Sequence, residues 1–71
     1  MSYISEQELN EIFSYLLGLP VKEAINMVGH SMTIRVLIRE GINEPADNFY
    51  KDNRINVEIK DKHIYRIISI G

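Results

Sequence analysis

The chain has 71 residues, a formal net charge of −2 at pH 7, two histidines and no cysteine. This length predicts a single domain over residues 1–71, in which about 60% of the unfolded surface can be buried. The lack of cysteine excludes disulfides and thiolate metal sites. Two histidines far apart in sequence are too few for a zinc site, so we expect neither a metal nor another cofactor.

The charges are divided unevenly along the chain. Residues 1–29 contain four glutamates and one lysine, whereas residues 30–71 contain seven basic and six acidic side chains. Because nucleic-acid binding needs several cations on one face, this mixture argues against a DNA or RNA partner. The N-terminus lacks the pattern of a signal peptide, and no apolar stretch is long enough to span a membrane. We therefore expect a soluble, cytoplasmic protein with no membrane partner.

A first helix is predicted from about residue 6 to residue 17. Ser5 followed by Glu8 is a capping-box pattern, in which the hydroxyl and the carboxylate each accept a hydrogen bond from a backbone N–H at the helix start. Apolar side chains recur at helical spacing and form one stripe: Leu9, Ile12, Phe13, Leu16 and Leu17. This stripe must cover either the sheet of the same chain or the same helix of a second copy, which would make a homo-oligomer.

A second, shorter helix is predicted from about residue 20 to residue 28. Pro20 suits the first turn of a helix, and Gly29 is a suitable terminator. The side chains expected on its buried face are Val21, Ala24, Ile25 and Val28.

The apolar period changes to two after residue 32, which predicts three strands over about residues 33–39, 54–60 and 64–70. The short connection at Asp61 and Lys62 makes the last two strands an antiparallel hairpin. The longer connection before it permits either orientation of the first two strands. Because the last strand is apolar on both faces, we expect it at the centre of the sheet. The predicted fold class is α+β.

The sequence shows no arrangement typical of an enzyme. His30 and Ser31 are adjacent in a loop, and this placement does not make an imidazole the base for a hydroxyl nucleophile. The acids Glu44, Asp47 and Asp52 lack the alternating ligand spacing and central glycine of a calcium loop. We therefore expect a binding protein and not an enzyme.

The connection over residues 40–53 is the candidate binding segment, because it is long for so small a domain. Pro45 reduces the freedom that this loop would lose on docking. Phe49 and Tyr50 are adjacent, so in extended backbone their side chains point to opposite sides. Either an exposed aromatic serves recognition, or Tyr50 packs onto the sheet and Phe49 caps it.

Four short motifs follow one another over residues 17–71: Leu17 to Pro20 before the second helix, Glu40-Gly41 after the first strand, Tyr50 with Arg54 and Asn56, and Ile70-Gly71. In this order they resemble the potato inhibitor I family of serine-protease inhibitors, particularly its small bacterial relatives. The resemblance implies an inhibitor-like core over residues 18–71, with residues 1–17 as an added N-terminal helix. It also implies a mixed sheet whose first two strands are parallel.

For function, the resemblance implies a small peptidase-inhibitor-like protein that presents the 40–53 loop to a serine protease as a substrate mimic. The scissile bond would lie between Asn48 and Phe49, with Asn48 as the specificity residue. Arg54 and Asn56 would support the loop, since they share the face of their strand opposite the buried apolar residues. The binding residues of the loop are then Glu44, Pro45, Asp47, Asn48, Phe49 and Tyr50.

A second hypothesis gives the same scaffold another use. The protein would be a non-enzymatic, oligomeric binding module that sequesters a small anionic ligand, such as a nucleotide, or blocks a host or viral protein. The strand arginines would converge on such a ligand across protomers, namely Arg35, Arg39, Arg54 and Arg66.

Overall fold

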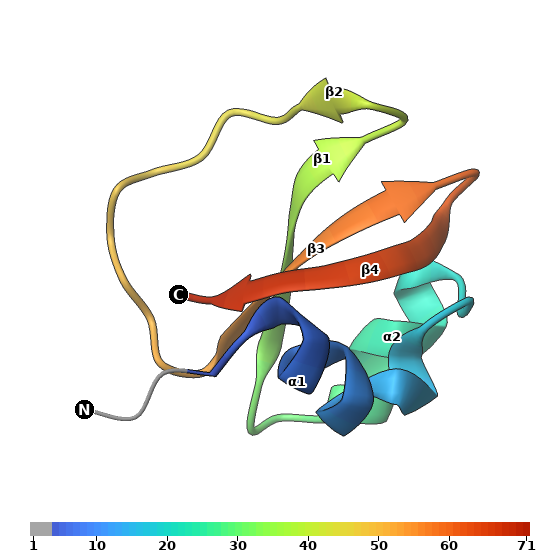
Figure 1. The fold of residues 1–71 in the computed structure, drawn as a ribbon, viewed down its shortest axis with the longest axis horizontal. Coiled ribbons are helices and arrows are strands. Elements are labelled where there is room, and N and C mark those ends of the chain that lie inside the picture. Colours follow the sequence, from blue (N-terminus) through green and yellow to red (C-terminus); the bar gives the residue numbers. More distant parts are fainter. Residues whose placement is uncertain (1–3) are drawn as a thin grey trace.

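A computed structural model describes residues 4–71 and shows an α+β fold with two α-helices and a four-stranded mixed sheet (Figure 1). The sheet order is β2-β1-β3-β4, in which β1 and β3 are parallel and the other two pairs are antiparallel. No helix among the described residues is long and apolar enough to cross a membrane. The elements are α1 (Glu6–Ile12), a short 3₁₀ helix (Ser14–Leu16), α2 (Val21–Val28), β1 (Thr33–Arg39), β2 (Ile42–Asn43), β3 (Arg54–Lys60) and β4 (His63–Ile70).

The expected α+β class, the two helices and the mixed sheet are confirmed, but the sheet has one strand more than predicted. The additional strand, β2, has only two residues and forms a hairpin with the end of β1. Glu40 and Gly41 connect these strands with φ angles of 52° and 78°. Two successive left-handed residues are typical of a type I′ hairpin turn, which folds the chain back directly after β1.

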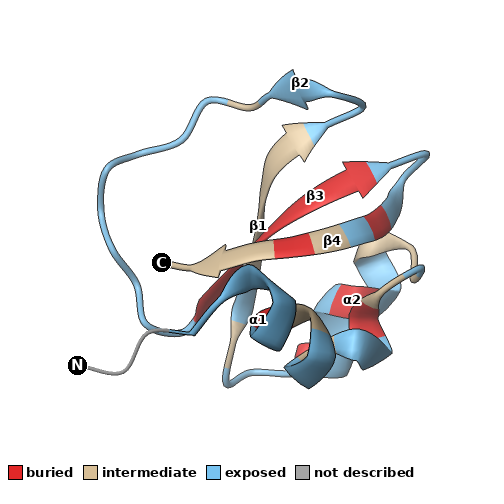
Figure 2. Ribbon diagram, viewed as in Figure 1, coloured by how far each residue is buried: buried red, intermediate tan, exposed pale blue. Residues whose placement is uncertain are grey.

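The two helices lie on the same face of the sheet, and the main core fills the space between the helices and the sheet (Figures 1 and 2). From the sheet, β3 and β4 provide the larger part of this core, and α1, the 3₁₀ helix and α2 provide the rest. The buried apolar side chains are Leu9, Leu16, Ala24, Val28, Ile55, Val57, Ile59, Ile64 and Ile67.

The inner strands are β1 and β3, and β4 lies at an edge of the sheet, so the prediction that residues 64–70 form the central strand is wrong. Six consecutive residues of β3, from Arg54 to Ile59, are buried (Figure 2). Arg54, Asn56 and Glu58 alternate with the apolar residues of this strand. Their polar groups are tolerated because each finds a hydrogen-bonding partner among the described residues.

Irregular pairing explains why simple alternation misplaced residues of β4. Strict alternation would place Ile64 and Ile67 on opposite faces, yet both are buried, opposite Ile59 and Val57 of β3. The register shifts twice along β3 and β4, and each shift adds one residue on the β4 side. Such bulges change the face on which later side chains lie. A similar shift in β1 places Ile38 opposite Glu58, not on the buried face with Ile34 and Val36.

The first helix is shorter than predicted. The Ser5–Glu8 capping box is present, but the α-helix ends at Ile12 and the chain continues through Phe13 into the 3₁₀ turn. This tighter turn brings Leu16 fully into the core, whereas Ile12, expected in the buried stripe, remains 55% exposed. The second helix agrees with the prediction within one residue, although Ile25 of its expected buried face is exposed.

The first helix packs against β4 of its own chain. The side-chain amide of Asn10 accepts a hydrogen bond from the N–H of Ile67 and donates one to its carbonyl oxygen, both at 2.8 Å. Further along the same edge, Gly18 N–H donates to Ile64 O at 2.8 Å, and Ile64 N–H donates to Leu19 O at 2.9 Å. Much of the outer edge of β4 is therefore hydrogen-bonded within the chain, which protects it from pairing with other molecules.

Candidate binding loop

Residues 44–53 run from β2 to β3 without regular structure and arc away from the end of the sheet (Figure 1). Phe49 and Tyr50 are 76% and 72% exposed, so neither ring is packed into the core. The ring of Tyr50 lies beside Gly71, because a methyl group added at Gly71 would be 3.4 Å from Tyr50 Cδ2. The alternative in which Tyr50 packs down onto the sheet is therefore wrong, and both aromatics are available to a partner.

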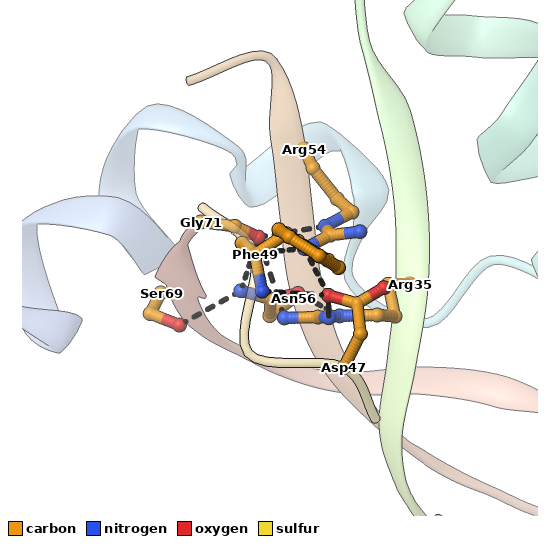
Figure 3. Close-up of polar contacts among 7 residues, drawn as sticks. All are labelled: Arg35, Asp47, Phe49, Arg54, Asn56, Ser69 and Gly71. Carbon is orange, nitrogen blue, oxygen red and sulfur yellow. Dashed lines mark hydrogen bonds and ion pairs between the residues drawn. The ribbon is translucent and has the colours of Figure 1, made fainter. Parts of the chain in front are cut away.

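Asp47 connects the loop to two strands (Figure 3). Its Oδ1 atom accepts a hydrogen bond from the N–H of Phe49 at 3.0 Å, and it lies 3.4 Å from both Arg35 Nη1 and Arg54 Nη2. The Phe49 N–H and the charges of the two arginines hold the pKa of Asp47 below its usual value. The carboxylate is thus ionised at neutral pH and fixes the backbone turn around Asn48.

Arg54 lies under the loop at the start of β3. Its Nη2 donates to the carbonyl oxygen of Phe49 at 2.7 Å, and its Nε donates to the main-chain oxygen of Gly71 at 2.7 Å. Only 7% of the residue is exposed. A buried guanidinium that satisfies two main-chain oxygens and one carboxylate is a rigid support, because its planar donors have fixed directions.

Asn56 does not reach the loop directly, in contrast to the expected role. Its Oδ1 accepts from Arg35 Nε at 2.8 Å, and its Nδ2 donates to Ser69 Oγ at 3.1 Å and to Gly71 O at 3.2 Å. Arg35 and Asn56 are register partners in the parallel pair of β1 and β3. Asn56 therefore orients Arg35, and Arg35 contacts Asp47 in the loop (Figure 3).

Sequence reasoning did not identify Gly71 and Ser69 as part of this network. The main-chain oxygen of Gly71 accepts hydrogen bonds from Arg35, Arg54 and Asn56, and the hydroxyl of Ser69 accepts one from Asn56. The final Ile-Gly was noted only as a motif. The hairpin that returns β4 alongside β3 is the signal that could have placed Gly71 next to Arg54.

The other predicted residues of the loop are placed as follows. Glu44 is half-buried and forms an ion pair with Arg39, while its N–H donates to Leu37 O at 2.8 Å. Pro45 and Asn48 are exposed. Two acids of the loop, Glu44 and Asp47, are thus paired with arginines of the same chain, whereas Asp52 is exposed.

Of the four arginines considered for an anionic ligand, only Arg35 and Arg54 converge, and both contact Asp47. Arg66 instead donates to Glu58 and to Glu6, each at 2.6 Å. The hydrogen bond to Glu58, together with the charge of Glu6, raises the pKa of Arg66. Arg39 and Arg66 are paired with carboxylates of their own, whereas Arg35 and Arg54 share the single carboxylate of Asp47.

Comparisons with protein-family models, with curated proteins and with solved structures found no match to this chain.

Proposed function

We propose that this protein is a small peptidase-inhibitor-like binding protein that presents its 44–53 segment to a serine protease, in the way that the resemblance to the potato inhibitor I family implies. One observation carries the proposal. The main chain around the Asn48–Phe49 bond is held from inside the molecule on the Phe49 side, by Asp47 at the N–H and by Arg54 at the carbonyl oxygen.

The carbonyl oxygen of Asn48 differs from that of Phe49, since no donor among residues 4–71 contacts it. A carbonyl that is to be attacked by a protease must be free to accept hydrogen bonds from the oxyanion hole of the enzyme. The Phe49 carbonyl does not meet this requirement, because Arg54 already occupies it. The geometry therefore favours the bond after Asn48 over the bond after Phe49.

The same contacts would make hydrolysis slow. During attack, the protease nucleophile bonds to the Asn48 carbonyl carbon and loses its proton, the C–N bond to Phe49 breaks, and the released amine takes up a proton. That amine remains tethered, because Arg54 holds the Phe49 carbonyl oxygen. A leaving group that stays in place favours re-formation of the bond, and a loop that is rigid before binding loses less entropy on docking.

The test is inhibition of a panel of serine proteases that differ in specificity pocket. Each enzyme is assayed with the wild type and with variants that carry the preferred residue of that enzyme, Asn48→Arg for trypsin-like and Asn48→Leu for subtilisin-like clefts. We expect stoichiometric inhibition by the matched variant. The double variants with Arg54→Ala should be weaker and should be cut faster in the loop, whereas adding Lys22→Ala, which truncates an exposed side chain of α2 and leaves the loop contacts intact, should have little effect. If no form of the protein inhibits any enzyme, the proposal is wrong.

A further inference from the structure

The side chain before the proposed scissile bond is an uncharged carboxamide that the protein leaves available. Asn48 is exposed, and its amide makes no hydrogen bond to any residue between 4 and 71. This contrasts with Asn10 and Asn56, whose amides are engaged inside the fold. Asp47 holds the N–H of Phe49 directly after Asn48, and Arg35 and Arg54 hold Asp47 in turn.

The surroundings of Asn48 do not alter this chemical character. The adjacent Asp47 is neutralised by Arg35 and Arg54, and Phe49 on the other side is apolar and 76% exposed. A partner that closes over this bond therefore meets a neutral amide followed by an aromatic ring.

We infer that the partner is an endopeptidase that recognises asparagine before the bond it cuts and accepts an aromatic residue after it. This inference rests on the proposed function. A carboxamide brings two N–H donors and one acceptor, and a pocket that buries it must satisfy both kinds of group. An apolar pocket leaves them unpaired, and a pocket built around a carboxylate for lysine or arginine leaves the amide oxygen without a donor. A pocket made for asparagine satisfies both.

The experiment measures inhibition of an asparagine-specific endopeptidase that cleaves a fluorogenic peptide with the sequence of residues 46–51. The forms compared are the wild type, Asn48→Leu, which keeps the shape and removes the polar groups, and Asn48→Asp, which replaces the amide by a charge. Asn43→Leu is the matched control, because Asn43 is exposed on β2 outside the supported segment. We expect inhibition by the wild type and by Asn43→Leu, and a loss of about a hundredfold or more for both Asn48 variants.

Two results would overturn the inference while leaving the proposed function intact. In the first, Asn48→Arg and Asn48→Leu inhibit trypsin-like and subtilisin-like enzymes, but the wild type has no effect on the asparagine-specific enzyme. In the second, the wild type inhibits that enzyme and Asn48→Leu does so equally well, which means that another residue is recognised. If no variant inhibits any of these enzymes, the proposed function fails and the inference fails with it.

Discussion

A single carboxylate oxygen of Asp47 joins the loop to β1 and β3, through the N–H of Phe49 and the guanidinium groups of Arg35 and Arg54. In the sequence this aspartate is one of several loop acids, together with Glu44 and Asp52. In the structure its charge is directed inward, where it holds the backbone. The residue that a partner would contact is the neighbouring Asn48.

This arrangement predicts a dependence on pH. The pKa of Asp47 is lower in the folded protein than in the unfolded chain, so its contribution to stability is present above the unfolded pKa and is lost as pH falls through the folded pKa. We expect Asp47→Asn to lower the free energy of unfolding at neutral pH. This difference from the wild type should shrink as the pH is lowered from about 4 toward 2. Urea unfolding of both proteins across this range checks it, and a difference independent of pH would contradict the role given to the carboxylate.

At the scale of single elements, two tight hairpins shape the end of the sheet that lies away from the bracing arginines. Glu40 and Gly41 turn β1 into β2, and Asp61 and Lys62 turn β3 into β4, with positive φ at all four residues. The two turns also contact each other, because the carboxylate of Glu40 accepts a hydrogen bond from the N–H of Asp61. The first turn determines where the loop begins, and the second returns β4 so that Gly71 can accept from Arg54.

A non-glycine residue in the left-handed conformation costs about 1–2 kcal/mol relative to its preferred conformation. Lys62, with φ of 66°, is exposed and occupies the second central position of its turn, where glycine is favoured. We expect Lys62→Gly to raise the free energy of unfolding by about 0.5–1 kcal/mol. Lys22→Gly is the control, because it places glycine in α2 and should be destabilising. Chemical denaturation of the two variants gives the values, and destabilisation by Lys62→Gly would show that the turn is not strained.

At the scale of the whole molecule, the residues that stabilise the fold and the loop that is proposed to bind a partner lie in different regions. The apolar core lies between the helices and the sheet, whereas the loop that carries the exposed Phe49 and Tyr50 arcs away from the end of the sheet (Figures 1 and 2). The buried polar network around Gly71 connects these two regions. A partner could therefore bind the loop without disturbing the core.

This separation predicts that two truncations of large side chains differ strongly in their effect on stability. Ile67 is fully buried, and Ile67→Ala should cost about 2–5 kcal/mol of unfolding free energy through lost burial and an internal cavity. Phe49→Ala should change stability by less than about 0.5 kcal/mol, since its ring is largely exposed. Thermal or urea unfolding compares the two. A strongly destabilised Phe49→Ala would mean that the loop aromatic belongs to the folded core.

The elements whose formation depends on residues close together in the sequence could be predicted from sequence alone. The capping box at Ser5, the second helix, and the hairpin at Asp61 and Lys62 follow from local spacing and turn chemistry, and they occur within one or two residues of the expected positions. Period-two alternation likewise located β1 and β3, because a strand with one apolar face has that signature wherever it lies in the sheet.

Only the tertiary structure decided the strand order, the bulges of β4 and the contacts that support the loop. Each of these depends on pairing between segments distant in sequence. Arg35 and Asn56 meet through the parallel register of β1 and β3, and Gly71 reaches Arg54 only because β4 folds back along β3. The sequence showed that a loop with Asn48, Phe49 and Tyr50 connects two strands. The physical basis of its rigidity is a set of hydrogen bonds between residues that local patterns cannot relate.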